Sequence, residues 1–201
     1  MPYDYSDAPP PQFDLIPHGT VATAVLHIRA GGVGEDKMLT RSKKDGSCEY
    51  LDCEITLTDT IYKGRKFWEI LILEGTTEGH FKSIGINRST LKAILDSALG
   101  LKPDDVSPQA RAARTVSLKQ FEGITFIAKI GIEKGGAKKD KNGNETGESW
   151  ADKNILAGVI TPDKKDWHPV EQPPPFNGGG SAPQAATPSG SAPPIARPGW
   201  A

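Results

Sequence analysis

Apolar and polar positions alternate in several separate stretches of this chain, which is the pattern of a strand with one buried face. Residues 20–32 form the first stretch, with inward positions at Ala22, Ala24, Leu26 and Ile28. Residues 48–57 alternate most regularly, with Leu51, Cys53, Ile55 and Leu57 inward and Tyr50, Asp52, Glu54 and Thr56 outward. Both stretches predict half-buried strands.

Three further stretches predict the remaining strands. Residues 65–75 are apolar on both faces, which indicates a strand covered on both sides or bent through a barrel. Residues 123–132 place a set of apolar positions inward, namely Ile124, Phe126, Ala128, Ile130 and Ile132. Residues 151–160 predict the fifth strand.

One amphipathic helix is predicted between the third and fourth strands. Its buried stripe follows the helical spacing of i, i+3, i+4, i+7 and i+8 through Leu91, Ile94, Leu95, Ala98 and Leu99. Either Asn87 or Ser89 can cap its start, and Gly100 can end it. Residues 107–114 and 117–123 predict short helical turns.

The order of these elements indicates the fold class. Three strands, a helix and two strands form the order of a five-stranded Greek-key barrel of the OB type. We therefore expect a mainly β fold, with an OB-like domain over residues 20–172 and one helix between strands three and four. Residues 1–19 are acidic and proline-rich, and they predict an extended arm. Residues 173–201 are rich in Pro, Gly, Ser and Ala and predict a disordered tail.

The charge balance excludes an overall attraction for nucleic acid, because the 201-residue chain has a formal net charge of −1. The arm holds Asp4, Asp7 and Asp14 and no Lys or Arg, whereas the tail holds Arg197 and no acid. The domain between them is close to neutral. Any basic surface must therefore be a local patch.

Two long loops predict such a patch. In OB-type folds, oligonucleotides bind around strands two and three and on the loops that join strands one to two and four to five. In this chain these loops are residues 31–47 and 133–149. The predicted phosphate-binding residues are Lys37, Arg41, Lys43 and Lys44, then Lys63, Arg65 and Lys66 at the third strand, then Lys134, Lys138, Lys139, Lys141 and Lys153.

Aromatic side chains complete the predicted site, because single-strand binders combine a positive groove with flat rings on which bases stack. Trp150 stands beside Asp152 and Asn154 on the polar face of the fifth strand, so we expect it to be exposed. Tyr62 and Trp68 are further candidates. The pattern of the third strand leaves open whether Trp68 is a core residue or a stacking platform.

Catalytic and metal-binding patterns are missing from the sequence. Its histidines have no metal-ligand spacing, and it contains no P-loop, nucleophile elbow or HExxH motif. We expect no metal, no cofactor and no enzymatic activity. Asp52 and Glu54 lie on one strand face, and this pair alone keeps open a two-carboxylate enzyme acting on nucleic acid or sugar.

The sequence also bears on localisation. Cys48 and Cys53 are predicted on opposite faces of one strand, so no disulfide between them is expected, and free thiols suit a reducing cytoplasm. The chain shows neither a signal sequence nor an apolar run of membrane-spanning length. We expect a cytoplasmic protein without a membrane partner.

Three motifs give the chain a family resemblance, namely YDYSDAPPPQFDLIPHGTVA, YKGRKFWEILILEG and ADKNILAGVITPDKKDW. They resemble phage and prophage single-stranded DNA-binding proteins of the OB type, formerly a domain of unknown function in phage replication and recombination modules. The likeness covers roughly residues 3–170, and GRKFWE together with ADKN is its most specific part. The matching positions are Tyr62, Gly64, Arg65, Phe67 and Trp68, with residues 151–154.

The resemblance implies a set of partners in the bacterial host cytoplasm: single-stranded DNA, and a phage recombinase or replication enzyme. One feature departs from bacterial single-strand binders, which end in an acidic tail with a hydrophobic tip. This tail has no acid, and Trp200 is either a docking hook or an ordinary tail residue. The acids lie in the arm instead, where Asp4, Asp7 and Asp14 are expected to compete with DNA.

The function predicted is sequence-tolerant binding of single-stranded DNA during phage DNA replication and recombination. The alternative is a protein-interaction adaptor, in which an OB-like barrel recruits replication or recombination proteins without binding DNA tightly.

Overall fold

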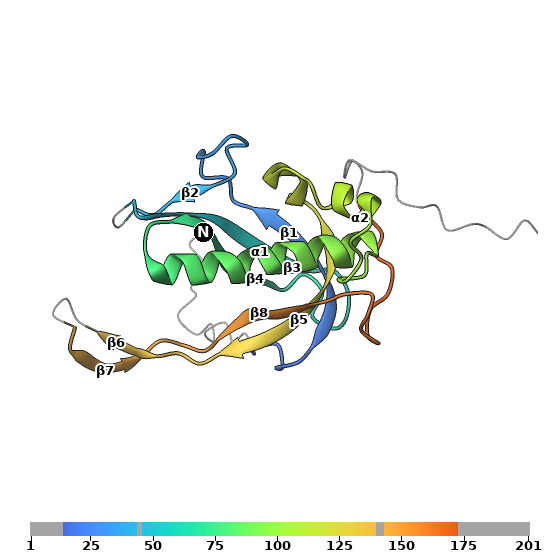
Figure 1. Cartoon of the computed structure of the whole chain (residues 1–201). Coiled ribbons are helices and arrows are strands. Elements are labelled where there is room, and N and C mark those ends of the chain that lie inside the picture. Colours follow the sequence, from blue (N-terminus) through green and yellow to red (C-terminus); the bar gives the residue numbers. More distant parts are fainter. Residues whose placement is uncertain (1–13, 44–45, 140–142, 173–201) are drawn as a thin grey trace, which may run out of the picture.

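The structure, a computed structural model, describes residues 14–43, 46–139 and 143–172. Figure 1 shows a sheet crossed by one long helix. Several predicted features lie outside the described residues: the arm before Asp14, Lys44, Lys141, the side chain of Lys139, and the tail from residue 173 with Trp200.

Six strands form one antiparallel sheet. At its centre β1 (Val21–Ile28) pairs with β3 (Cys48–Leu57), and β3 pairs in turn with β4 (Lys66–Gly75). On the other side β1 pairs with β5 (Thr125–Glu133), which pairs with β8 (Lys153–Ile160). The short β2 (Thr40–Arg41) pairs with the start of β3. The predicted mainly β class is confirmed.

The stretch expected to be a plain loop at residues 133–149 contains a second, two-stranded sheet. It is formed by β6 (Ala137–Lys139) and β7 (Glu145–Ser149), which pair antiparallel. Figure 1 shows this hairpin projecting away from the main sheet, as an extension of the turn between β5 and β8. Every described residue of β7 is exposed, which explains why no apolar periodicity marks it.

The predicted helix is present between β4 and β5, but its predicted start is wrong. α1 (Glu78–Leu99) begins just after Thr77, whose hydroxyl accepts a hydrogen bond from the His80 backbone N–H at 3.2 Å. The His80 ring accepts in return from the Thr77 N–H, which completes a capping box. The first half of α1 leaves Phe81 and Ile86 exposed, so it lacks the buried stripe on which the prediction depended.

The later part of the helical region follows the prediction. Gly100 ends α1 in the left-handed conformation, with φ of 68°. α2 (Pro108–Ala113) begins after the cap Ser107, and a 3-10 turn spans Leu118–Phe121. Within the described residues, no helix combines the length and the apolar character needed to cross a membrane.

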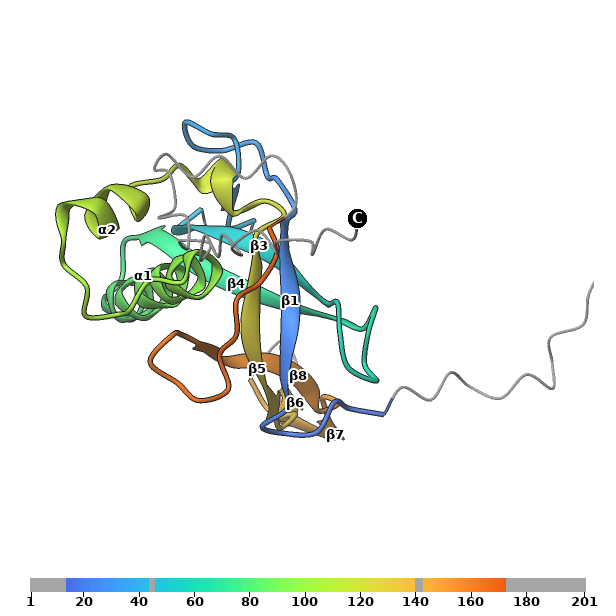
Figure 2. The ribbon, with the colours of Figure 1, turned by 90° about the vertical axis from the view of Figure 1, so that its right-hand side faces the viewer.

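The core lies between the sheet and α1. The alternation predicted for β1 and β3 is confirmed, since their inward positions are buried. Residues 125–128 of β5 are buried on both faces, and the Ile127 N–H donates to Ser97 Oγ of α1 at 3.0 Å. Figure 2 shows α1 end-on beside the sheet.

The two outer strands, β4 and β8, approach each other without forming a ladder among the described residues. A side chain bridges them instead: Glu69 Oε1 accepts the Leu156 backbone N–H at 2.5 Å. Glu69 lies in β4 between the buried Phe67 and Leu71, so its carboxylate points toward the core side of the strand. The sheet is therefore strongly curved, but a closed barrel is not established by its pairing.

A buried ion pair fixes the end of α1 to the segment that follows it. Asp96 is 1% exposed and accepts from Arg114 Nε at 2.6 Å and from Lys92 Nζ at 2.7 Å. Arg114 also donates to the carbonyls of Asp105 and Lys102. This network satisfies the carboxylate and two loop carbonyls that the fold takes out of water.

Replacing Arg114 by Met should destabilise the protein by about 3 kcal/mol, because it leaves the Asp96 charge buried beside a single remaining cation. Urea denaturation followed by circular dichroism measures the free energy of unfolding. Lys92→Met is the matched control, since that side chain is 44% exposed and its loss should cost under about 1 kcal/mol. Equal losses in the two variants would contradict this account.

Glu69 predicts a pH dependence of stability. Burial raises the pKa of its carboxyl, against the smaller lowering effects of the Leu156 N–H and Lys153. Ionisation of Glu69 thus costs more in the folded state, and its stabilising contribution is lost as pH rises through the raised pKa. Glu69→Gln keeps an acceptor for Leu156, so it should be more stable than the native chain at pH 7.

The difference in stability between Glu69→Gln and the native chain should vanish below the pKa of a free glutamate, about 4.3. Thermal midpoints of both proteins across pH 3.5 to 8 are the measurement. Glu74→Gln, a variant at an exposed position of the same strand, serves as the control and should show no such divergence.

Candidate nucleic-acid interface

A groove of about 600 Å³ runs along β4 and the start of β8, and residues from both faces of β4 line it. We call it the tryptophan groove. Its bases are Arg29, Arg65, Lys66 and Lys153, its carboxylates are Asp52, Glu69 and Asp152, and its exposed apolar side chains are Trp68 and Ile70. It brings together three of the predicted phosphate-binding residues and one predicted platform.

Trp68 lies on the outside of the sheet. Strand alternation turns Phe67 and Leu71 into the core and leaves Trp68 and Ile70 outside, 50% and 60% exposed. The open question about Trp68 is thereby answered, because an indole exposed to this extent is not a core residue. Its exposed ring surface can accept a stacked base.

Each base in the groove already has an acceptor. Lys66 Nζ lies 2.6 Å from Glu54 Oε1, Lys153 Nζ lies 2.9 Å from Glu133 Oε2, and Arg29 Nη2 lies 2.5 Å from Asp52 Oδ1. Arg65 donates instead to the backbone carbonyl of Asp14 at 2.7 Å. The three ion pairs involve basic side chains that are about half exposed or more, so each is weak and can be exchanged.

Glu54 organises the centre of the groove wall. The pKa of its carboxyl is lowered, above all by the hydrogen bond from Lys66, with a further contribution from a hydrogen bond from Trp68. Glu54 faces Trp68 across the β3–β4 pair. A carboxylate that stays ionised thus holds a cation and an indole beside each other on one surface.

A second groove, of about 440 Å³, lies at the base of the β6–β7 hairpin. Its lining includes Lys134 and Trp150, and it shares Asp152 and Lys153 with the tryptophan groove. Trp150 is 66% exposed, and Lys138 Nζ lies 5.1 Å from its ring centroid. The two grooves therefore form one continuous path with an exposed indole in each part.

The lysines of the hairpin are also paired with acids. Lys134 Nζ lies 2.6 Å from Asp152 Oδ2, and Lys138 Nζ lies 2.8 Å from Glu148 Oε2. The hydrogen bond from Lys134 lowers the pKa of the Asp152 carboxyl. The near-zero net charge of the sequence thus appears in the structure as local pairs of one lysine and one acid.

The expected polar face around Trp150 needs correction. Trp150 precedes β8, and Asn154 is buried rather than exposed on an outward face. The Asn154 side-chain amide accepts from the Ile16 N–H at 2.9 Å and donates to the Ile16 carbonyl at 2.8 Å. A partner 138 residues away in sequence thus turns a polar residue inward.

The remaining predicted bases lie elsewhere. Lys37, Arg41 and Lys43 belong to the β1–β3 loop and line neither groove. Arg41 folds back on its own hairpin, with Nη2 2.6 Å from Glu49 Oε1. Tyr62 is half-buried against the core and offers less free ring surface than the two tryptophans.

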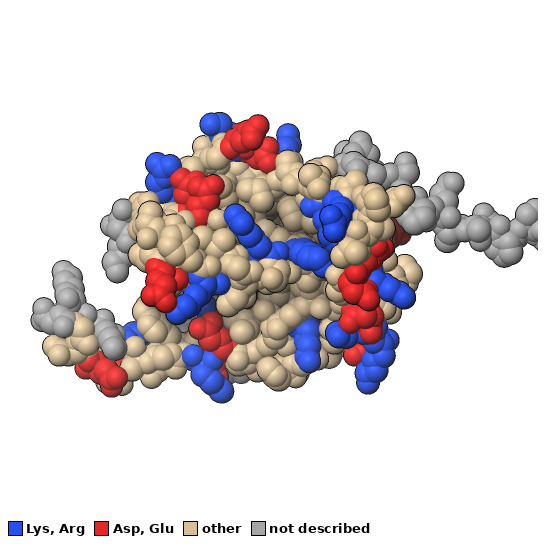
Figure 3. Space-filling view, viewed as in Figure 1, with Lys and Arg blue, Asp and Glu red and all other residues tan. Residues whose placement is uncertain are grey.

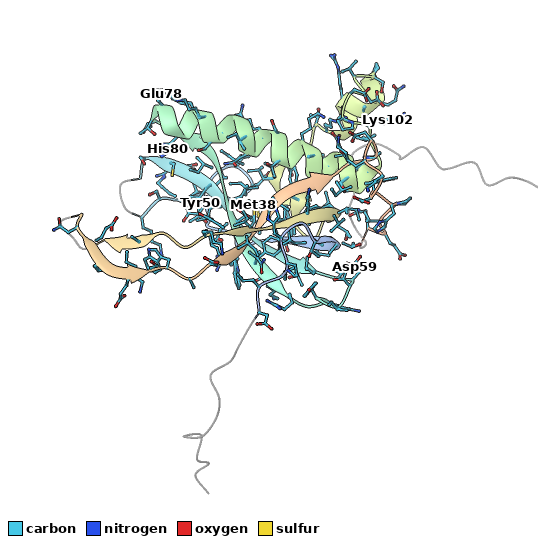
Figure 4. All side chains as sticks on the ribbon, turned by 90° about the horizontal axis from the view of Figure 1, so that it is seen from below. Met38, Tyr50, Asp59, Glu78, His80 and Lys102 are labelled. Carbon is cyan, nitrogen blue, oxygen red and sulfur yellow. The ribbon has the colours of Figure 1, made fainter. Side chains whose placement is uncertain are left out.

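The β3–β4 turn carries Tyr62 and the exposed Lys63, and hydrogen bonds to β1 hold it in place. Asp59 accepts from the Thr23 backbone N–H at 2.9 Å and from the Thr23 hydroxyl at 2.6 Å. Figure 4 labels Asp59 on the side of the sheet away from α1, whose start carries Glu78 and His80. Lys63 therefore extends from an anchored turn, outside the two grooves.

Another hollow, of about 610 Å³, lies beside β1 and the start of β5, and its described lining contains no Lys or Arg. Figure 3 shows basic side chains running across the middle of the face that carries α1, with the acidic side chains toward its edges. Among the described residues, no group of three His, Cys, Asp or Glu side chains is arranged to hold a metal ion. Arg29 is the basic residue of the tryptophan groove that was not predicted from the sequence, although it directly follows the first strand.

Comparison with known proteins adds no further assignment. No protein-family model matches the chain, and no curated protein matches it.

Proposed function

We propose that the protein binds single-stranded DNA without sequence preference and catalyses no reaction on it. One observation carries the proposal: Trp68 and Trp150 are both exposed along a continuous path that also presents Lys66 and Lys153. Stacking platforms beside exchangeable cations are the two elements that a single-strand binder requires. The family resemblance adds phage DNA replication and recombination as the setting.

The strand order supports an OB-type barrel as the scaffold. The sheet runs β4-β3-β1-β5-β8, and α1 lies in sequence between β4 and β5, as in that fold. In this proposal the contact of Glu69 with Leu156 closes the barrel between β8 and β4. The proposed DNA surface then occupies the second and third barrel strands and the fourth-to-fifth connection, which is where OB folds bind oligonucleotides.

Binding would proceed by exchange of acceptors. A phosphate replaces Glu54 on Lys66, and another replaces Glu133 on Lys153, since both cations are in exposed pairs. Bases stack on Trp68 and Trp150, and stacking tolerates any sequence because every base has a π-face. The loop bases at residues 37–43 contribute little in this geometry.

A protein-interaction adaptor is the second candidate, and α1 favours it. Phe81 and Ile86 are 60% and 68% exposed on its first half, where a partner could cover them. In either case, we propose that Trp200 provides the contact for a recombinase or replication enzyme. Quenching of tryptophan fluorescence by oligo(dT) separates the two functions, because an adaptor that does not bind DNA shows none.

Trp68→Ala should weaken oligo(dT) binding by about 5- to 150-fold, because loss of one stacking platform costs about 1–3 kcal/mol. Fluorescence anisotropy of a labelled oligonucleotide gives the Kd. Trp68→Phe should retain most of the affinity, and Phe81→Ala tests an equally accessible ring outside the path. A Trp68→Ala variant that binds like the native protein would remove the basis of the proposal.

Lys66→Ala and Lys153→Ala should each reduce the slope of log Kobs against log salt by up to about 0.7, the value for one phosphate contact to a single strand. Titrations at four salt concentrations measure it. Lys37→Ala is the matched control from the β1–β3 loop and should leave the slope unchanged. If Lys37→Ala lowers the slope while the groove variants do not, DNA follows a different surface.

A further inference from the structure

We propose that residues 1–13 occupy the tryptophan groove when no nucleic acid is bound, and that a single strand must displace them. The inference rests on the proposed function, since it assigns a competitor to the same groove. Three features carry it: the anchor that fixes the chain at one end of the groove, the direction of the chain at that point, and the composition of residues 1–13.

The first feature is an anchor at one end of the groove. Ile16 is 1% exposed, and both its backbone N–H and its carbonyl bond the Asn154 amide. Asn154 also donates to the Gly131 carbonyl at 3.2 Å. Figure 2 shows this first part of the chain, in dark blue, at the bottom of the sheet below β1. The point from which residues 1–13 extend is therefore fixed.

The second feature is the direction of the chain at that point. Leu15 lines the tryptophan groove, and the Asp14 carbonyl accepts from Arg65 Nη2 at 2.7 Å. From Arg65 the outer face of β4 continues to Ile70, and the four steps from Lys66 to Ile70 span about 13 Å. Thirteen extended residues reach about 40 Å, which is more than enough to cover this face.

The third feature is composition. The segment contains Asp4 and Asp7 and no Lys or Arg, so its carboxylates can replace phosphates on the groove cations. Tyr3 and Tyr5 supply rings that can stack on the exposed indole, as bases would. The prolines at residues 9–11 favour an extended polyproline conformation, which lowers the entropy lost on docking.

The tail is a poorer occupant. It contains Arg197 and no acid, so its charge does not complement the groove bases. It also leaves the domain at Gln172, whose amide bonds the Thr125 backbone on both sides, at 2.9 and 2.7 Å. That is the start of β5, whereas the groove lies at the start of β8, which pairs with the end of β5.

Tethering makes a weak contact effective. A short linker holds the segment at millimolar effective concentration over the groove. If the segment occupies the groove nine-tenths of the time, the apparent affinity for DNA falls about tenfold. Removing residues 1–13 should therefore raise the apparent affinity for DNA about tenfold at low salt. This gain should disappear at high salt, because charge also holds the segment in the groove.

The deciding experiment needs no DNA. The indole N–H resonance of Trp68 is compared by NMR in the full chain, in a chain that begins at Asp14, and in full-length Asp4→Asn/Asp7→Asn. We expect a shift on truncation, an intermediate shift in the double variant, and return toward the full-chain position when a peptide of residues 1–13 is added. A chain lacking residues 173–201 is the control and should match the full chain.

An unchanged Trp68 resonance in the truncated chain, with no response to the peptide, overturns the inference. The thermal midpoint verifies that truncation leaves the domain folded. A separate titration with oligo(dT) tests for the tenfold gain in affinity. Failure of all variants to bind oligo(dT) would refute the proposed function, while the peptide-induced shift would still establish the docked segment.

Discussion

The approach of two unpaired sheet edges is the constraint on which the rest of this molecule depends. β4 and β8 end the sheet, and their free backbone groups need partners once they are turned away from water. Side chains supply them: Glu69 accepts from Leu156, and Asn87 Nδ2 donates to the Ile72 carbonyl at 3.0 Å. Because side chains rather than a ladder bridge the gap, the edges stay apart and a groove remains between them.

The groove takes its chemistry from the pleat of β4. Alternation places Lys66, Trp68 and Ile70 on one face, and the start of β8 adds Lys153. The neighbouring strand provides Glu54, which pairs with Lys66 and lies opposite Trp68 in the β3–β4 ladder. The surface is thus ordered without a ligand. An incoming phosphate therefore has to displace a carboxylate.

Periodicity predicted the elements that bury one face and little else. β1, β3 and the second half of α1 follow the expected pattern because each has one apolar face against the core. The first half of α1 depends on its cap at Thr77 and not on burial, so no stripe reveals it. The inward positions of Glu69 and Asn154 depend on partners 87 and 138 residues away, which no local pattern contains.

The predicted site residues differ in the same way, according to whether burial fixes the element that carries them. Arg65, Lys66, Trp68 and Lys153 lie in or beside strands whose register is determined by burial, and the fold brings them into one groove. The loop bases were grouped only by their place in the chain order. Arg41 instead pairs with Glu49 across the short β2–β3 ladder, so local pairing holds that loop on its own hairpin.

The internal ion pairs also determine what salt does to this surface. Added salt weakens the attraction of Lys66 for a phosphate, but it also weakens the pair with Glu54 that must break first. The net effect of salt on each contact is therefore smaller than for a free lysine. A nearly neutral domain can in this way bind a polyanion through local exchange and stacking, without a long-range positive field.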